Sequence, residues 1–512
     1  MLNRLSIPLC QFLCAALLLP CLAGAASAIA TADDAIPSHP RDIQYPPLTF
    51  AAPKASEFRR TLSDGTIVFM APDKTFPLVT LSVNAMGGQN QIGGEMVGLA
   101  GLAASQMRTG GTERLTPSEV DENLDFMASS VSVTSGPWSS GASLNALATN
   151  FDATLSMMMD MLKAPRFDAD RLRIAKETML EGLKQRNDDA DSIAGYEWKM
   201  LLYGEDTWRG AQPTADEIMA MGEGQLREAS SQVFRPGNYV LTVSGDFDPD
   251  QMMQKLEKAF VSETPAQARN AAPGADAHTT PHGLYHAQKD IPQGKVFIGG
   301  RSLQRDDPDV VAATLMNEIL GGGGFTSRIT KRVRSDEGLA YSAGSGFRAD
   351  PFTLGTINAG VQSKNATVAL SIKLILEEFA RMRDTLVSEE ELATAKKSFI
   401  ETFPQTFGSK AATVAVFAED EMTGRDAAWW DTYRDRVNAV TREDVQRVAQ
   451  RLLQPGAMAV LVVGDWEEIA PGDENGRASM KDVEAVFGPV QHLPARDPLS
   501  LKPLPQVAPS PN

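Results

Sequence analysis

Cysteine is nearly absent from this sequence, and its positions exclude several kinds of chemistry. The 512 residues include three cysteines, Cys10, Cys14 and Cys21. All three lie in a segment that we expect to be removed as a secretory signal. The mature chain would then lack disulfides, thiolate zinc ligands and cysteine nucleophiles. Such a chain suits a bacterial periplasm, or secretion.

Histidine is also scarce, with five copies in the whole chain. His278, His282 and His286 recur every fourth residue, a spacing that would line one face of a helix. Pro281 and Gly283 interrupt that helix, and the surrounding composition is that of a linker. We therefore expect adventitious metal affinity there at most. The remaining two histidines are isolated in proline-rich ends: His39 and His492.

Other absences narrow the function further. No G-x-S-x-G elbow is present, so a serine nucleophile of that type is not indicated. The glycine run at 321–324 lacks the G-x-x-x-x-G-K-[ST] layout of a phosphate-binding loop. The formal net charge of −17 argues against nucleic acid or an anionic lipid surface as the partner.

The first 28 residues have the pattern of a secretory signal. Arg4 gives the charged start, residues 9–22 the apolar core, and Ala26-Ser27-Ala28 the small-residue cleavage site, with Ala30 as an alternative. The apolar run is shorter than the ~20 residues that a membrane span requires. Cys21 follows Leu-Leu-Pro, a poor context for lipid attachment. We expect a periplasmic or secreted chain without membrane insertion after cleavage.

Local signals mark the start of several elements. Asp64-Gly65 predicts a turn between two short strands. Thr116, with Glu119 three residues later, predicts a capping box that opens a helix at Pro117.

The chain also repeats itself at an offset of about 220 residues. FRPGNYVLTVSGDF at 234–247 matches LQPGAMAVLVVGDW at 453–466, with Pro, Gly, Val, Gly and Asp at equal places. Two further pairs share the offset: 218–221 with 437–440, and 172–176 with 392–396. We predict an α+β protein of two tandem homologous α/β units, each a mostly antiparallel mixed sheet covered by helices.

Composition shifts give the predicted boundaries. These are a signal peptide at 1–28, an extended arm at 29–53, the first unit at 54–261, a linker rich in Ala and Pro at 262–284, the second unit at 285–490 and a Pro-rich tail at 491–512.

The most informative stretch runs from Gly321 to Phe347. Four glycines are followed by a short helical pattern that ends near Gly338, and then by a predicted strand from Leu339. Arg334 at the helix end and Tyr341 near the strand start are seven residues apart, so the turn between them can bring guanidinium and phenol to one surface. The alternative is a solvated basic helix face followed by a half-buried strand aromatic. The four glycines are Gly321, Gly322, Gly323 and Gly324.

This plan resembles the M16 family of zinc peptidases, which includes insulinase, pitrilysin and the mitochondrial processing peptidase. The likeness covers about 46–489 and rests on the two tandem units, each with a strand ending in GD(F/W), and on the R-x-x-x-x-x-x-Y spacing. The family carries H-x-x-E-H where this sequence reads GLAGLAASQMRTGGT at 98–112. Gly101 and Ser105 replace the two histidines and Ala104 replaces the glutamate, and none of these can bind zinc or act as the base. The place of the third ligand falls on Glu181, which is also explained as a solvated helix residue.

The resemblance implies a non-catalytic subunit that pairs with a homologous H-x-x-E-H chain in a heterodimer. Zinc would belong to that partner, and this chain would hold no cofactor. Arg334 would bind a substrate carbonyl or C-terminal carboxylate, Tyr341 would donate to the oxyanion, and the glycine run at 321–324 would border the peptide chamber. A stand-alone peptide-binding or chaperone-like module is the alternative. A core subunit of a respiratory complex is disfavoured by the signal, and an independent hydrolase has no motif in its favour.

Overall fold

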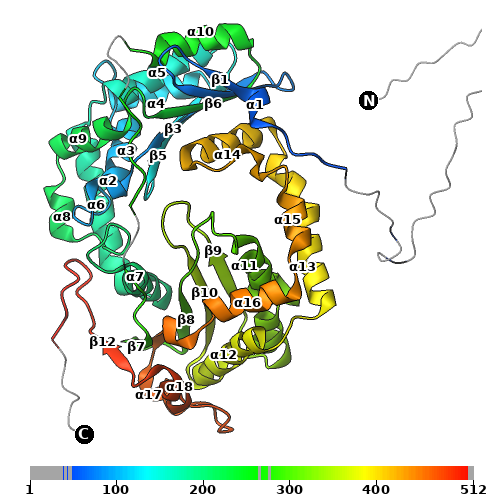
Figure 1. Ribbon diagram of the computed structural model, residues 1–512. Helices are drawn as coiled ribbons and strands as arrows, with labels where there is room; N and C mark the ends of the chain where they lie inside the picture. The colour runs from blue at the N-terminus through cyan, green and yellow to red at the C-terminus, as the bar shows by residue number, and fades with distance from the viewer. Residues whose placement is uncertain (1–38, 40–42, 44–48, 263–266, 275–277, 506–512) are drawn as a thin grey trace, which may run out of the picture. The chain divides into compact units, whose positions relative to one another are not determined.

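Two six-stranded sheets of the same plan organise the chain (Figure 1). In sheet order, the first contains β1 (Arg59–Thr61), β2 (Ile67–Pro72), β6 (Tyr239–Gly245), β3 (Leu78–Met86), β5 (Ser139–Leu147) and β4 (Ser130–Ser135). The second contains β12 (Gln491–Leu493), β7 (Gly283–Gln288), β11 (Ala459–Gly464), β8 (Gln293–Arg301), β10 (Thr356–Lys364) and β9 (Ala343–Arg348).

The computed structural model describes residues 39, 43, 49–262, 267–274 and 278–505. The chain divides into a short unit, Met1–Thr49, and a compact unit, Phe50–Asn512. The predicted signal peptide with its three cysteines, most of the predicted arm, and 506–512 of the predicted tail lie outside the described residues.

Strand pairing in the two sheets matches almost pair for pair. The repeated Gly-Asp segments form β6 and β11, each parallel to one neighbour and antiparallel to the other. Both are buried along their length because they run through the middle of a sheet that is covered on both faces. The remaining pairs are antiparallel except β12 with β7. The predicted α+β fold with two mostly antiparallel mixed sheets is therefore confirmed.

Helices cover one face of each sheet from within the same half of the chain. The helices of the first half are α1 (Ala55–Phe58), α2 (Gln89–Ile92), α3 (Leu99–Thr109), α4 (Pro117–Phe126), α5 (Phe151–Lys163), α6 (Ala169–Lys184), α7 (Ala190–Tyr203), α8 (Ala215–Ala220), α9 (Glu223–Val233) and α10 (Pro249–Phe260), with a 3-10 turn η2 (Gln185–Asn187).

The second half adds α11 (Val310–Asn317), α12 (Val368–Asp384), α13 (Glu389–Thr402), α14 (Lys410–Thr423), α15 (Tyr433–Ala439), α16 (Arg442–Leu452), α17 (Trp466–Ile469) and α18 (Met480–Phe487). Its 3-10 turns are η4 (Gly324–Thr326), η6 (Asn365–Thr367), η7 (Phe403–Phe407), η8 (Ala427–Trp429) and η9 (Pro455–Ala457), and its π-helical segments are η3 (Glu318–Gly322) and η5 (Thr330–Asp336).

Each half also lends one helix to the opposite face of the other half's sheet. Helix α7 packs on β8 and β11, with Trp198 against Phe297 at 5.7 Å between ring centres. Helix α14 packs on β2 and β6, with Phe417 against Phe69 at 6.0 Å (Figure 1). Both faces of the central strands β6 and β11 are therefore buried, and the two halves share apolar cores instead of standing as independent domains.

Local capping follows the sequence signals. The Thr116 hydroxyl accepts from the Glu119 amide while the Glu119 carboxylate accepts from the Thr116 amide, so the predicted capping box opens α4. Gly65 turns the chain between β1 and β2 with φ +90°, as the Asp64-Gly65 pair predicts.

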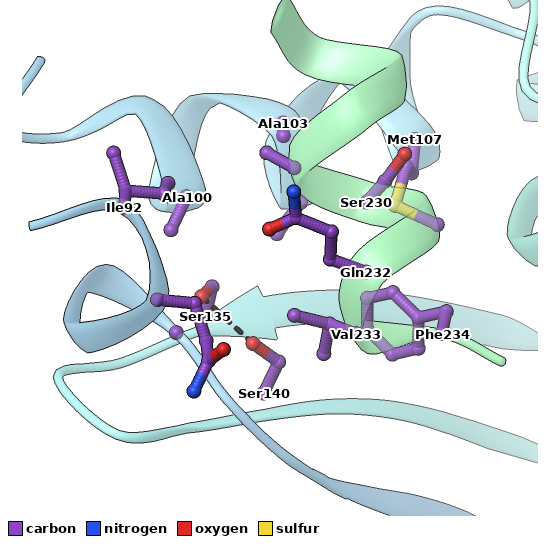
Figure 2. Close-up of a pocket in the computed structure, with 14 residues that line it drawn as sticks. Ile92, Ala100, Ala103, Met107, Ser135, Ser140, Ser230, Gln232, Val233 and Phe234 are labelled. Carbon is purple, nitrogen blue, oxygen red and sulfur yellow. Dashed lines mark hydrogen bonds between the residues drawn. The ribbon is translucent and has the colours of Figure 1, made fainter. Parts of the chain in front are cut away.

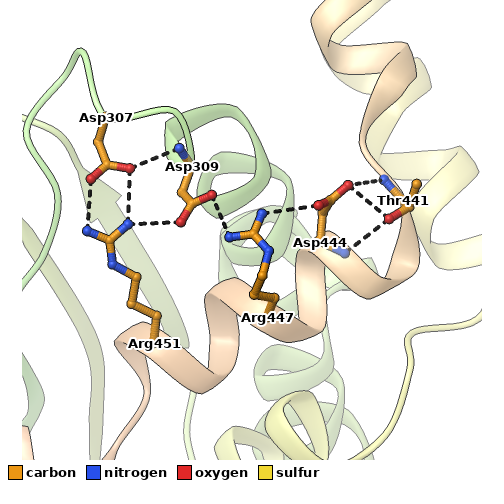
Figure 3. A network of polar contacts seen from close by, with 6 residues as sticks. All are labelled: Asp307, Asp309, Thr441, Asp444, Arg447 and Arg451. Carbon is orange, nitrogen blue, oxygen red and sulfur yellow. Dashed lines mark hydrogen bonds and ion pairs between the residues drawn. The ribbon is translucent and has the colours of Figure 1, made fainter.

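An ionic network fixes α16 against the start of α11 (Figure 3). Asp309, which is buried, accepts from Arg447 at 2.7 Å and from Arg451 at 2.8 Å. Arg451 also donates to Asp307 at 2.8 Å. The carboxylates lower the net positive charge on the outer face of α16 and set its register on α11.

The second sheet reaches into the predicted linker and tail. Strand β7 begins at Gly283, and β12 pairs with it in parallel from 491 to 493. Part of the linker is also held against the first half, because the Asn270 side chain donates hydrogen bonds to the carbonyls of Met86 and Gln232. Among the described residues, no helix is long and apolar enough to cross a membrane.

Candidate functional site

The segment after α11 is held to the core by π-helical turns. Helix α11 runs directly into η3, and η5 follows after a short 3-10 turn. Ile329 and Val333 are fully buried, which fixes the inner side of η5. Segments of π-helix are rare and often occur at functional sites, because the extra residue redirects side chains. Here the outward side of the segment carries Arg334.

Arg334 lies between two exposed aromatic rings. Its guanidinium carbon is 4.7 Å from the ring centre of Tyr341 and 4.6 Å from that of Phe325. Tyr341 is 85% exposed and Phe325 69% exposed. The sequence-predicted pair is thus brought together on one surface, and Phe325 joins it. Phe325 was missed by the sequence reasoning, although an aromatic directly after four glycines is itself a signal.

The charge on Arg334 is not neutralised by a neighbour. No ion pair or side-chain hydrogen bond of Arg334 occurs within the described part of the chain. Arg328, six residues earlier, differs: it donates to Glu391 at 2.7 and 2.9 Å. The hydrogen bonds from Arg328 lower the pKa of Glu391 to about 2. The donors of Arg334 are therefore available to a ligand.

The strand after Arg334 begins later than predicted. Strand β9 starts at Ala343 instead of Leu339, so Tyr341 lies in the bend before it. The reason is the end of η5, where the Gly338 amide donates to the Arg334 carbonyl and the Leu339 amide to the Val333 carbonyl. Gly338 has φ +65°, and this turn returns the chain toward the helix before it extends.

The glycine run has a packing reason for its composition. A Cβ on Gly321 would lie 2.3 Å from the backbone nitrogen of Ser345, so only glycine lets η3 rest on β9. A Cβ on Gly323 would lie 2.7 Å from the Glu318 carbonyl, whereas Gly324 has open space and φ +61°. Gly322 lies between them, against Asn317. A role of this loop beside a peptide chamber stays a prediction.

The degenerate metal positions lie on helix α3. Gly101 and Ser105 share its exposed face one turn apart, whereas Ala104 is buried. Glu181 on α6 is exposed and pairs with Lys184 at 3.0 Å. The donor set does not fit zinc, because a hydrogen, a methyl and a serine hydroxyl replace two imidazoles and a carboxylate. In the described ranges, no group of three His, Cys, Asp or Glu side chains is placed to hold a metal ion.

The buried side of α3 packs closely on α9 (Figure 2). Between them is a cavity of about 10 Å³, enough for one water molecule. Ala103 and Ala104 contribute methyl groups, and the Ser135 and Ser140 hydroxyls hydrogen-bond at its edge at 2.8 Å. The small side chains of α3 therefore serve packing in this protein.

The histidines expected in the linker occupy three separate environments. His278 hydrogen-bonds the Leu201 carbonyl, and His282 stacks on Phe487 at 5.4 Å between ring centres. His286 belongs to β7, not to the linker, and is buried. The periodic spacing fails to make a common face because the chain is extended here, not helical.

Comparisons with known proteins agree with this geometry. The structure is a two-unit α+β chain without metal-binding side chains at the α3 positions Gly101, Ala104 and Ser105. Residues 222–399 match the family model described as "Peptidase M16 inactive domain". The chain is 27% identical over 355 residues to "Non-peptidase homolog YmxG" of Helicobacter pylori, covering 66% of this chain and 78% of that one.

Solved structures show the same fold. A peptidase M16 inactive domain from Pseudomonas fluorescens superposes with a TM-score of 0.72 at 21% identity, covering 80% of this chain and 97% of that one. The periplasmic protease PqqL of Escherichia coli gives a TM-score of 0.66 at 15% identity over 83% of this chain, which spans 47% of that protein. The chain is thus similar to inactive domains of the M16 peptidase family, and it lacks the zinc ligands of that family at the α3 positions.

Proposed function

We propose that this chain is the non-catalytic, substrate-binding subunit of a secreted or periplasmic heterodimeric M16-type zinc metallopeptidase. The partner would be a homologous chain with an intact H-x-x-E-H helix and the zinc ion. The single observation that carries the proposal is the half-buried Arg334, which has no ionic partner among the described residues and lies between the exposed rings of Tyr341 and Phe325. Exposed aromatic rings around an uncompensated guanidinium are typical of a binding surface.

The chemistry assigned to the pair follows from its donors. The planar Arg334 guanidinium can hold a peptide carbonyl or a C-terminal carboxylate by charge-assisted hydrogen bonds. The Tyr341 phenol can donate to the oxyanion that develops on the scissile carbonyl, an interaction whose loss typically costs ~3 kcal/mol in the transition state. The partner's zinc and glutamate would supply the attacking water.

The export prediction and one relative support the proposed location. Residues 1–28 have the signal pattern, and the solved protease PqqL is described as periplasmic. A periplasmic pair of this kind would act on peptides that reach the same compartment.

Purification of a tagged chain from its native periplasmic extract tests the pairing. We expect a second protein with H-x-x-E-H at equal amount and about one zinc per pair, because the zinc ligands must come from the partner. A lone, zinc-free protein would overturn the heterodimer and favour the stand-alone peptide-binding alternative. Mass spectrometry of the eluate and metal analysis by plasma emission give both readouts.

A further inference from the structure

A second pocket opens beside the exposed face of α3. Its volume is about 470 Å³, within the range of sites that bind small ligands. The bare backbone of Gly101 forms part of its wall, and a Cβ at this position would meet nothing within 4 Å. The pocket thus lies next to the positions where the family's metal ligands are replaced.

The lining carries positive charge that the protein does not neutralise. Lys199 on α7 and Arg348 at the end of β9 both line the pocket. Neither forms an ion pair or a side-chain hydrogen bond in the part of the chain that the structure describes. No aspartate or glutamate occurs among the described lining residues. The chain as a whole has a net charge of −17, so two cations without an acidic partner in one pocket favour an anionic ligand there.

A third cation in the pocket, Arg209, is neutralised by an ion pair and helps to form the pocket wall. Arg209 pairs with the buried Asp350 at 2.5 Å and hydrogen-bonds Thr353. Although burial opposes it, the pKa of Asp350 is lowered by hydrogen bonds from the Phe352 and Thr353 amides and by the Arg209 charge. Burial, followed by the Arg209 charge, lowers the pKa of Lys199. An anion in the pocket would favour the charged form of that lysine.

Aromatic rings form the rest of the walls. The Arg209 guanidinium lies 4.9 Å from the ring centre of Tyr203 and 5.2 Å from that of Trp208. Trp138 is fixed by an edge contact with Phe352 at 5.0 Å. Rings held in this way offer flat apolar surface at little entropic cost.

We propose that this pocket binds the C-terminal carboxylate of a peptide whose last residue is aromatic or otherwise apolar. Lys199 and Arg348 bind the carboxylate, and the rings of Trp138, Tyr203 and Trp208 contact the terminal side chain. A compact oxyanion such as phosphate would use the two cations and leave the rings uncovered, so the walls favour the peptide.

The choice of a peptide as the source of the carboxylate rests on the function proposed above. The pocket itself is distinct from the surface of Arg334 and Tyr341, and none of those residues lines it. It would select peptides with a free end, whereas the Arg334 surface would act on the bond to be cleaved.

Isothermal titration calorimetry of the purified chain with N-acetyl-Ala-Ala-Phe and with its C-terminal amide tests the inference. The free acid is expected to bind at least about tenfold more tightly than the amide, because the charge-assisted hydrogen bonds need the carboxylate. Lys199→Gln and Arg348→Gln should each weaken binding of the acid by about tenfold. Lys199→Arg keeps the positive charge and should retain binding of the acid. This variant keeps the test valid if Lys199→Gln fails to fold. Lys258→Gln, which removes one charge from a different pocket, is the matched control and should bind as the wild type does.

Three results would overturn the inference. These are equal affinity for acid and amide, wild-type affinity in both the Lys199→Gln and Arg348→Gln variants, and full displacement of the acid by an equal concentration of inorganic phosphate. The titration needs only the isolated chain. A chain that binds the acid but purifies without a zinc-containing partner would keep the pocket and overturn the proposed heterodimer instead.

Discussion

The Tyr341 ring lies 4.7 Å from the Arg334 guanidinium and keeps 85% of its surface exposed. A tyrosine so exposed is not retained for packing, and its hydroxyl is free to reach a ligand. In the proposed heterodimer, Tyr341→Phe should lower kcat by about 100-fold if its phenol is the oxyanion donor, with complex formation unchanged. Steady-state kinetics and analytical ultracentrifugation of the pair give the two readouts.

The control for that variant is Tyr433→Phe, which removes a phenol from a ring packed 4.9 Å from Phe403. Its kcat should equal that of the wild type. An unchanged rate for Tyr341→Phe would remove Tyr341 from the catalytic step.

Phe325 contributes the second ring of the Arg334 stack. Phe325→Ala should raise KM about two- to fivefold with a smaller effect on kcat, because an exposed cation–π contact contributes about 0.5–1 kcal/mol and here it orients a binding group. Phe126→Ala, at a phenylalanine that is 92% exposed on another helix, is the matched control. If both variants gave the same KM, the ring of Phe325 would have no part in substrate binding.

The two-unit architecture could be predicted from the sequence because the internal repeat is visible in the residues themselves. The Gly-Asp segments at 245 and 464 end corresponding strands, and Thr116 caps the helix that it was predicted to cap. Arg334 and Tyr341 could be placed on one surface because only a turn separates them.

Features that depend on distant contacts could not be predicted. Lys199 and Arg348 are remote in sequence, and nothing local indicates that they line one pocket. The π-helical form of 330–336 depends on the packing of η5 on the core, which no periodicity encodes. Likewise, the sequence pattern groups His286 with the linker, whereas in the structure it belongs to β7, which pairs with β11 and β12.

Strand β7 carries His286, whose contact with His492 is expected to be sensitive to acid. The Nδ1 atom of His286 is 2.9 Å from the Nδ1 atom of His492, and its Nε2 atom is 3.0 Å from the Gly464 carbonyl. These partners assign a neutral His286 that donates from Nε2 and accepts from His492. Burial lowers the pKa of His286 to about 4, against the Gly464 hydrogen bond that would raise it.

The free energy of unfolding should therefore fall as the pH decreases from about 6.5 to about 4. Over that window the unfolded chain binds the proton of this group and the folded chain does not, so stability rises with pH and is complete above the unfolded pKa. The loss attributable to His286 is at most about 3 kcal/mol. Urea titrations at a series of pH values should show a shallower pH dependence for His286→Gln than for the wild type. His282→Gln serves as the control, and equal slopes for all three proteins would show that His286 does not carry the effect.

Substitutions at Gly321 and Gly324 test two different roles of the glycine run, one in packing and one in substrate binding. Gly321→Ala should destabilise the fold by about 1–3 kcal/mol, because the new Cβ would lie 2.3 Å from the Ser345 nitrogen and η3 would have to move away from β9. Gly324→Asn should cost little, since the site has open space and asparagine tolerates φ +61°. Thermal unfolding measures the first effect, and cleavage of a peptide library by the assembled pair measures the second. A changed cleavage profile in Gly324→Asn at wild-type Tm would place the loop beside the peptide, whereas an unchanged profile would leave the glycines with a packing role alone.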